Sequence, residues 1–364
     1  EISSGGTMTA KLWAYDAAYN NAFGHSLHFY DNIMVIGSDG VDYTPQIDNT
    51  GAAYIYSRVS NGNSWSFQYK LVIQDKSAWA GKWVDIYETT IFVSKTGDSD
   101  SAGAVIVYNG DLLTGWTQTA VLVASDRRQN DYFGWSFSVY ENTLAIGAYL
   151  DDDFGQDTGS VYIFNSVGIE WSQQSKLIAA NPTIQDQYGY TVSLYGDNLI
   201  VGNPQDDDLG AYSGSAFVYH KENNQWTQST KIIPEGGLPN SYYGYSVSLH
   251  DLELVVSAYK SDDGGGDTGS VYVYNITSLP TPSPTFMPST SPTFRPSSLP
   301  SSSPTYKPTA IPTSRPTFSP TISNIPTNVF LSAMRFSVTQ VLVDVDYQLY
   351  MNDYEASNDK FAQS

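Results

Sequence analysis

Residues 133–164 decide the fold: they read FGWSFSVYENTLAIGA at 133–148 and, after an acidic loop, GSVYIF at 159–164. Apolar and polar side chains alternate through 134–140, and Glu141-Asn142 supplies a turn before the next apolar run at 143–148. Such alternation, rich in β-branched and aromatic residues and broken by short turns, is typical of strands rather than helices. Together with the run at 119–124, these segments predict a unit of four short strands.

The chain contains five copies of this unit. A glycine preceded by an aromatic or small residue begins each copy, with spacings of 57, 53, 55 and 55 residues: Gly24, Gly81, Gly134, Gly189 and Gly244. Tryptophans mark the junctions (Trp65, Trp116, Trp171, Trp226), and the last run repeats an aromatic pair: Tyr54/Tyr56, Tyr162/Phe164, Phe217/Tyr219 and Tyr272/Tyr274. Four strands repeated about every 50 residues are typical of propeller blades. The sequence therefore predicts an all-β fold, a β-propeller with five four-stranded blades over residues 1–278.

These segments resemble the FG-GAP repeat, the propeller repeat also found in the integrin α-subunit head. The resemblance rests on Phe-Gly at 23 and 133, Tyr-Gly at 188 and 243, the VIGS and AIGA elements, and GSVYIF, and it covers roughly residues 8–275. Integrin-type repeats hold calcium between the first two elements. Here a tight turn such as Glu141-Asn142 stands in that place, so the resemblance does not carry that site over.

Closure of the ring needs a fourth strand for the last blade, because no run like Lys176-Leu177-Ile178 follows Tyr274. The run at 9–14 resembles the missing strand and precedes the first unit. We predict that it pairs with the last blade and covers an edge that would otherwise aggregate. The alternative is that these blades are part of a larger ring.

A proline-rich stretch over 279–328 follows the propeller. From Pro284 to Pro320 a proline stands at every fourth position, each followed by Ser or Thr. Regular proline favours polyproline II, and Ser/Thr-rich proline tracts are commonly O-glycosylated. We predict a glycosylated stalk, the alternative being a naked linker. The predicted sites are the sequon residue Asn275 and the stalk residues Thr285, Ser289, Thr293, Ser297, Ser301, Thr305, Thr309, Thr313, Thr317 and Thr321. Such tracts beside FG-GAP repeats resemble surface proteins of diatoms and related algae.

Residues 329–364 form a third segment, with strand character over 329–345 and the start of a helix over 346–363. One strand and one helix cannot bury a core alone. The segment is therefore either part of a domain or docks on another molecule, since a tethered strand suits addition to a neighbour's sheet edge. The alternating apolar residues predicted to bind a partner are Phe336, Val338, Val341 and Val343.

Acidic loops follow the AIGA-like element in three units. Carboxylates at alternating positions around a glycine suit a calcium loop, which needs six to eight oxygen ligands. The candidate ligands are Asp151, Asp153, Asp157, Asp206, Asp208, Asp263 and Asp267. The alternative is a solvated acidic turn, and no organic cofactor is expected.

Composition and motifs exclude several classes of protein. The net charge of -20 argues against nucleic acid and anionic membranes as partners, and the absence of cysteine excludes disulfides and thiol chemistry. No stretch is apolar enough to span a bilayer. The chain starts at Glu1 with no signal peptide, as expected of a processed or truncated product. No nucleophile elbow, phosphate loop or zinc motif occurs, so we expect no enzyme.

We therefore expect a secreted or cell-surface structural glycoprotein that forms head-to-tail fibres with copies of itself. One alternative is an adhesion or glycan-binding receptor whose partners are extracellular glycans or proteins. A second alternative is an extracellular hydrolase.

Overall fold

The computed structural model describes residues 10–42, 49–58, 64–234, 237, 239–262 and 264–276. All of them belong to one compact unit. The predictions for the stalk at 279–328 and the tail at 329–364 lie outside the described residues. The same holds for the stalk hydroxyls from Thr285 to Thr321, the tail residues Phe336, Val338, Val341 and Val343, and the acidic residue Asp263.

Five antiparallel sheets make up the described unit, each built from consecutive strands. The first sheet contains β1 (Leu27–Tyr30), β2 (Ile33–Ser38), β3 (Ala52–Arg58) and β4 (Trp65–Val72); the second contains β5 (Ala80–Tyr87), β6 (Thr90–Lys95), β7 (Ala104–Asp111) and β8 (Gly115–Leu122). The third contains β9 (Ser136–Tyr140), β10 (Thr143–Ala148), β11 (Ser160–Val167) and β12 (Glu170–Leu177); the fourth contains β13 (Thr191–Tyr195), β14 (Asn198–Asn203), β15 (Ser215–Glu222) and β16 (Gln225–Ile232). The fifth has three described strands, β17 (Tyr243–His250), β18 (Glu253–Ala258) and β19 (Ser270–Asn275). The predicted all-β propeller architecture is confirmed.

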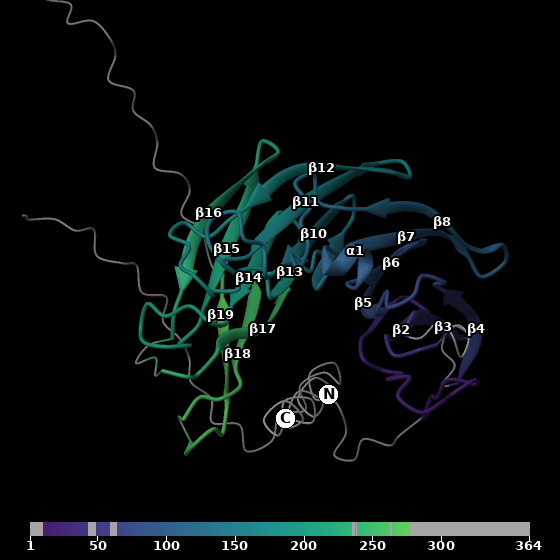
Figure 1. Ribbon diagram of the computed structural model, residues 1–364, viewed down its shortest axis with the longest axis horizontal. Coiled ribbons are helices and arrows are strands. Elements are labelled where there is room, and N and C mark those ends of the chain that lie inside the picture. The colour runs from purple at the N-terminus through teal and green to yellow at the C-terminus, as the bar shows by residue number, and fades with distance from the viewer. Residues whose placement is uncertain are drawn as a thin grey trace, which may run out of the picture. The chain divides into compact units, whose positions relative to one another are not determined.

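The sheets follow one another in an arc in chain order (Figure 1). The first strand of each sheet lies innermost, since β1, β5, β9, β13 and β17 contact one another in succession. The chain then passes from the outer strand of one blade to the inner strand of the next. For this reason the run at 119–124, predicted as the first strand of the third unit, lies mostly in β8 of the second sheet.

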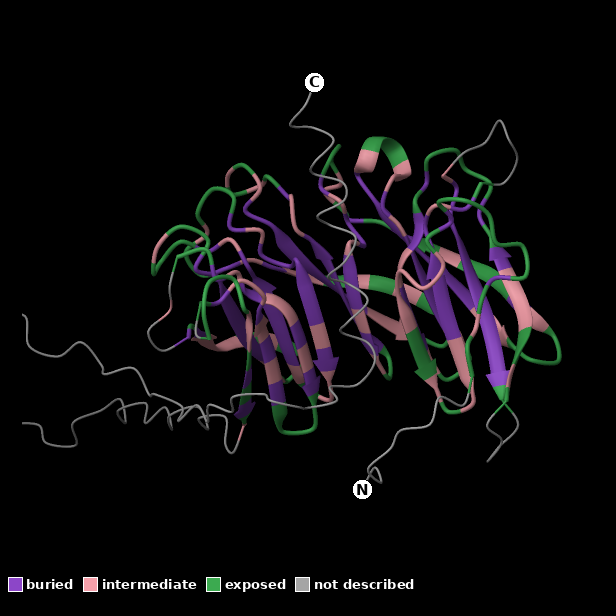
Figure 2. Ribbon diagram, turned by 90° about the horizontal axis from the view of Figure 1, so that it is seen from below, coloured by how far each residue is buried: buried purple, intermediate pink, exposed green. Residues whose placement is uncertain are grey.

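Apolar side chains are buried between successive sheets. All six residues of β10 are buried, whereas the outer strand β12 consists of exposed and half-buried residues except for the buried Leu177 at its end. Figure 2 shows buried residues concentrated in the strands and exposed residues in the turns. Between the third and fourth blades, Val161 and Ile163 of β11 share one buried cluster with Leu194 of β13. The hydrophobic core is thus a series of layers between blades.

The repeated glycines are explained by close approach of neighbouring blades. Gly159 has a φ of +80°, and a Cβ there would lie 2.1 Å from the carbonyl oxygen of Tyr188 in the next blade. The two residues form an isolated parallel bridge. Only glycine tolerates both this φ and this contact, so the repeat keeps glycine at the corresponding positions.

The predicted ring closure by the run at 9–14 is wrong for its described part. Residues 10–14 form no strand, and Leu12 and Ala14 pack on the first sheet beside Tyr54 and Tyr56. The Tyr56 hydroxyl also donates to the Trp13 carbonyl at 2.8 Å. The apolar surface of the first sheet thus binds the run that was expected on β19.

The helix α1 (Asp98–Ser101) is a single distorted turn. Among the described residues no helix is long and apolar enough to cross a bilayer.

Candidate functional site

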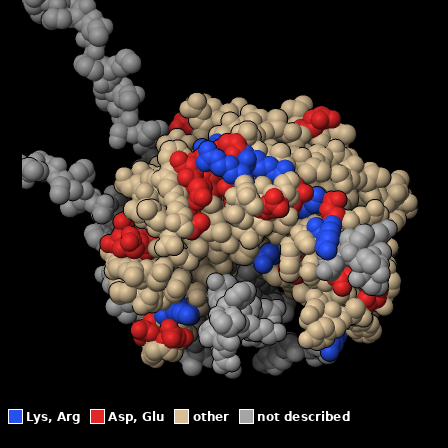
Figure 3. All heavy atoms as spheres, viewed as in Figure 1, with Lys and Arg blue, Asp and Glu red and all other residues tan. Residues whose placement is uncertain are grey.

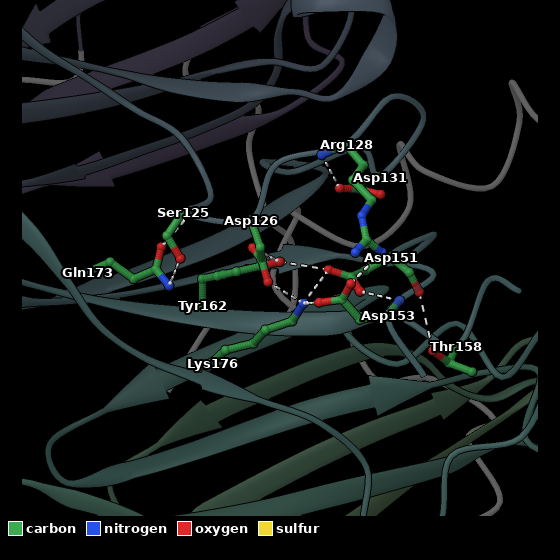
Figure 4. Close-up of polar contacts among 10 residues, drawn as sticks. All are labelled: Ser125, Asp126, Arg128, Asp131, Asp151, Asp153, Thr158, Tyr162, Gln173 and Lys176. Atoms are coloured by element: carbon green, nitrogen blue, oxygen red, sulfur yellow. Dashed lines mark hydrogen bonds and ion pairs between the residues drawn. The ribbon is translucent and has the colours of Figure 1, made fainter. Parts of the chain in front are cut away.

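The acidic loop of the third blade closes over a lysine from the outer strand. Lys176 Nζ, on β12, donates to Asp126 Oδ2 at 2.8 Å, Asp151 Oδ2 at 2.8 Å and Asp153 Oδ2 at 2.5 Å (Figure 4). Oxygens of the three carboxylates lie within 4.8 Å of one another, close enough to share a metal ion. We call Asp126, Asp151, Asp153, Tyr162 and Lys176 the third-blade cluster.

Backbone contacts fix the loop that carries two of these carboxylates. The Asp153 amide donates to Asp151 Oδ1 at 3.0 Å, and the Gly159 amide donates to the Asp151 carbonyl at 3.0 Å. The Thr158 hydroxyl donates to the same carbonyl at 3.2 Å. The local sequence therefore folds the loop as an Asx-type turn and directs both carboxylates toward Lys176.

Tyr162, on β11, forms hydrogen bonds to two of these carboxylates. Its hydroxyl lies 2.6 Å from Asp151 Oδ2 and 2.8 Å from Asp126 Oδ1, and Lys176 Nζ lies 5.0 Å from its ring centroid. Burial and the hydrogen bond to Asp151 raise the pKa of Tyr162, which keeps the hydroxyl protonated. Burial alone would raise the pKa of Asp126, but hydrogen bonds from Lys176 and Tyr162 outweigh it and lower that pKa.

The ammonium itself is stabilised as a cation. Burial opposes its charge, yet the hydrogen bonds to Asp126, Asp151 and Asp153 raise the pKa of Lys176. A second cation, Arg128, pairs with Asp153 from the exposed side. Two cations thus face three carboxylates, so the third-blade cluster together with Arg128 has one carboxylate more than it has cations.

Asp131 lies next to the cluster and is buried. Its Oδ2 accepts the backbone amide of Arg128 at 2.7 Å. Burial, with smaller contributions from Asp151 and Asp152, raises the pKa of Asp131 to about 6. This carboxyl group therefore titrates near neutral pH.

Three other blades bring an ammonium to carboxylates in the same way. In the fourth blade Lys231 Nζ lies 2.5 Å from Asp206 Oδ2 and 2.6 Å from Asp208 Oδ2. In the first blade Lys70 lies 2.6 Å from Asp16, which also accepts the Tyr54 hydroxyl at 2.9 Å. Figure 3 shows basic side chains next to acidic ones on the face in view, together with further acidic groups that have no basic neighbour there.

The second blade reaches this arrangement from a different strand. Lys95, at the end of β6, lies 2.7 Å from both Asp75 and Asp98. The outer strand has Val121 where the third blade has Lys176, so the cation has moved to another strand while the ion pairing remains.

The predicted calcium ligands are only partly brought together. Asp151 and Asp153 converge, and Asp206 and Asp208 share Lys231. Asp157 lies outside the third-blade cluster, with its amide donating to Asp152. Asp267 likewise donates its amide to Asp262.

Calcium binding stays a prediction, and a divalent ion at the centre of the third-blade cluster would have to displace Lys176.

Sequence reasoning missed Asp126 and Lys176, because they come from segments distant from the acidic loop. A usable signal was present in the Lys-Leu or Lys-Ile pairs that end the outer strands: Lys70-Leu71, Lys176-Leu177 and Lys231-Ile232. These pairs recur in register with the acidic loops. The predicted glycan acceptor Asn275 is exposed at the end of β19 and stays a prediction.

A comparison with known protein families agrees with the repeated sheets of the structure. The family model of the FG-GAP repeat matches residues 7–56, 116–164, 171–219 and 226–274, which is more than half of the chain. The second blade, unmatched between 57 and 115, is the copy with Ala80 before its glycine and with Lys95 as its cation. No curated protein sequence matches the chain significantly.

Two solved structures are similar to part of the chain. Sqt1 from Saccharomyces cerevisiae is 12% identical with a TM-score of 0.42, and the match covers 70% of this chain and 59% of that one. A putative 6-phosphogluconolactonase from Bacteroides uniformis is 7% identical with a TM-score of 0.49, covering 69% and 67% of the two chains. The chain thus spans about 59% of the length of Sqt1. At this identity neither likeness bears on function. The repeats themselves, which are typical of extracellular domains, identify the chain as a member of the FG-GAP repeat family.

Proposed function

We propose that the protein is a structural extracellular or cell-surface glycoprotein that assembles into fibres. The propeller is a rigid bead, residues 279–328 are a glycosylated spacer, and the segment at 329–364 binds the propeller of a neighbouring copy. The observation that supports this proposal is the outer edge of β19, which has no fourth strand among the described residues.

The four complete sheets indicate what this edge can bind. In the third blade β11 pairs with β10 on one edge and with β12 on the other. In the fifth blade β19 pairs with β18 alone in the described part of the chain. The edge strand of a sheet can take up an added strand through backbone hydrogen bonds, and the alternating residues Phe336, Val338, Val341 and Val343 suit that role. Head-to-tail addition of this kind builds a filament when it does not close.

Deleting residues 329–364 from the full chain tests the proposal. Negative-stain images and sedimentation of the intact chain should show regular fibres, and the deletion should leave single particles. Fibres that persist without the segment would exclude it as the connector.

A point substitution gives a matched control. Val338→Pro removes a strand amide and should abolish fibres, whereas Val338→Thr keeps the amide and the β-branched shape and should preserve them. Equal fibre formation by both variants would contradict strand addition. Glycopeptide mass spectrometry at Asn275 and along the stalk tests the extracellular assignment independently.

A second candidate function, glycan binding by an adhesion receptor, is favoured by a row of aromatic rings. Trp135, Tyr190 and Tyr245 directly follow the repeat glycines of three successive blades, with ring centroids 5.8 and 5.1 Å apart. Lys82 Nζ lies 4.4 Å from the Trp135 ring centroid. Trp135 and Tyr245 are partly exposed, whereas Tyr190 between them is buried. Exposed aromatic faces such as those of Trp135 and Tyr245 can stack on sugars.

Glycan-array binding tests the second candidate. Trp135→Ala should abolish any binding, and Trp13→Ala, at an exposed tryptophan on the first blade, should not. Binding that survives Trp135→Ala would rule out this row as the site.

A further inference from the structure

The side chains that directly follow the repeat glycines differ in chemistry from blade to blade. In chain order they are His25, Lys82, Trp135, Tyr190 and Tyr245. From the second blade onward they lie next to one another, because Lys82 Nζ is 4.4 Å from the Trp135 ring centroid and the next ring centroids are 5.8 and 5.1 Å apart. The series therefore changes from charged to aromatic between Lys82 and Trp135.

A second position, directly after the second strand of each sheet, extends the same division. Tyr149 lies 4.5 Å from Trp135 between ring centroids, and both side chains are partly exposed. In the first blade Asp39 has this position, and its Oδ1 lies 2.9 Å from Nδ1 of His25. The third blade thus presents two rings where the first presents an ionic pair, and Lys82 lies at the boundary.

Lys82 differs from the lysines of the acidic loops. The ammonium groups of four other lysines each lie within 2.8 Å of an aspartate oxygen: Lys70, Lys95, Lys176 and Lys231. In the part of the chain that the structure describes, Lys82 Nζ has neither a hydrogen bond nor an ion pair, and it lies over the indole of Trp135. Its N–H groups are thus available to an acceptor that the described residues do not supply.

The environment of Lys82 favours an added anion. Burial lowers the pKa of Lys82, and the charge of Asp39, which is paired with His25, opposes this only in part. The pKa values of Lys95, Lys176 and Lys231 are raised instead, because carboxylates accept their hydrogen bonds. A half-buried cation without an acceptor costs free energy that an anionic oxygen would recover.

The net charge of the protein limits how much negative charge the ligand can carry. With 37 acidic and 17 basic side chains, the chain repels a polyanion. One anionic group, placed at the single ammonium of Lys82, avoids most of this repulsion. The neighbouring indole adds a flat apolar surface, and a few polar groups beside such a surface fix a ligand's orientation.

We propose that Lys82 and Trp135 form a binding site for a sugar that carries one anionic group, a carboxylate or a sulfate ester. The sugar ring would stack on the exposed part of the Trp135 indole, and the anionic oxygens would accept hydrogen bonds from Lys82 Nζ. This inference rests on the glycan binding given above as the second candidate function, and it adds the charge that the sugar must carry.

A pair of matched sugars tests the inference on the full chain. Methyl glucuronide and methyl glucoside differ only in a carboxylate against a hydroxymethyl group, and ligand-observed NMR titrations measure the affinity of each. The glucuronide should bind at least about tenfold more tightly, as expected of one charge-assisted hydrogen bond. The sulfate ester of methyl glucoside, used as a third ligand, shows whether the site accepts both anionic groups or only the carboxylate.

Substitutions separate the contribution of the charge from that of the ring. Lys82→Met should lower glucuronide affinity to that of the glucoside, whereas Lys82→Arg keeps the cation and should keep the preference. Trp135→Ala should weaken both sugars, since both stack on the indole. Lys221→Met is the matched control: Lys221 Nζ lies 6.0 Å from the Trp226 ring centroid in the fourth blade, and its loss should change neither affinity.

Thermal melts of Lys82→Met distinguish ligand binding from a purely structural role. Because burial disfavours this cation, removal of its charge should leave the melting temperature unchanged or raise it. A lower melting temperature together with unchanged glucuronide binding would show that Lys82 only supports Trp135, and would overturn the inference.

The titrations also separate this inference from the proposals above. A glucuronide preference that is lost in Lys82→Met and kept in Lys82→Arg supports it. Equal affinity of the native chain for glucuronide, sulfate ester and glucoside would overturn it and leave glycan binding standing. No binding of any of the three sugars would overturn both. Fibre assembly is read separately by negative stain, where Lys82→Met should behave as the native chain does.

Discussion

The acidic loops of the third and fourth blades have similar sequences, but different side chains donate hydrogen bonds to their carboxylates. In the third blade Asp151 is bound by Lys176 and the Tyr162 hydroxyl, with Asp126 as a third carboxylate. In the fourth blade Phe217 replaces the tyrosine, and Asp206 is bound by Lys231, Ser215 Oγ at 2.7 Å and Asn203 Nδ2 at 3.1 Å. The ion pair is thus the common element of the two blades, and its supporting hydrogen bonds vary.

The comparison predicts unequal dependence on the two lysines, and this is the largest expected effect. Lys176→Met leaves three neighbouring carboxylates facing Arg128 alone, and we expect a loss of about 2–4 kcal/mol in the free energy of unfolding. Lys231→Met should cost about 1–2 kcal/mol, because Asp208 is exposed and Asp206 keeps three other donors. Urea unfolding of the full chain measures both. Equal losses would show that the third carboxylate adds nothing.

Calcium should distinguish the same two variants. With its ammonium removed, the third-blade cluster offers three converging carboxylates, so 10 mM Ca²⁺ should stabilise Lys176→Met by about 1–3 kcal/mol over EGTA. Lys231→Met has two carboxylates and should respond less. Thermal melts with Ca²⁺ or EGTA provide the measurement, and melts of the native chain test the original calcium prediction. An unresponsive Lys176→Met would end the case for a metal at this cluster.

Exchanging the aromatic residues tests the supporting hydrogen bonds. Tyr162→Phe removes a hydroxyl that binds two carboxylates and should cost about 1–2 kcal/mol. The reciprocal Phe217→Tyr should place a hydroxyl near Asp206, whose carboxylate already has four donors, and should change stability by less than about 1 kcal/mol. Denaturant midpoints of the two variants should therefore move unequally. A Phe217→Tyr gain as large as the Tyr162→Phe loss would contradict this reading of Asp206.

The smallest expected effect is a pH dependence that both blades share. Asp131 in the third blade and Asp186 in the fourth have pKa values raised by burial, to about 6 for Asp131. A raised carboxyl pKa means that the folded state binds the proton more tightly, so stability falls as pH rises from about 4 to about 6.

Asp131→Asn removes this penalty and keeps the acceptor for the Arg128 amide. It should be more stable than the native chain by about 1 kcal/mol at pH 7.5, with no difference near pH 4. Asp186→Asn should behave alike. Melts across this pH range provide the check, and a difference that grows toward pH 4 would contradict the assignment.

Much of the fold followed from periodicity. Alternation in segments such as 134–140, with glycines at a nearly constant spacing, predicted the strands and the blades, because sheet faces and close backbone contacts restrict residue types locally. Ring closure was predicted wrongly, because the sequence of residues 10–14 suits an outer strand equally well as packing on Tyr54 and Tyr56. Pattern alone does not decide between two apolar surfaces.

The candidate site was less accessible to sequence reasoning. The acidic loop identified Asp151 and Asp153, since both lie in one short segment. Lys176 and Asp126 reach them from 25 residues away, through strand pairing and the passage from one blade to the next. An acidic loop whose sequence suggests a metal site can therefore be paired with a lysine from another strand. The position of that lysine follows only from the assembled sheet.

The lysine at the centre of the third-blade loop has one further consequence. A cation attached to the polypeptide is present at unit occupancy in every molecule and cannot be lost by dilution. A free ion in its place would leave and return with the composition of the surrounding water. Lys176, Lys231, Lys70 and Lys95 therefore give the acidic groups that they contact a counter-charge whose amount does not depend on the ions dissolved around the protein.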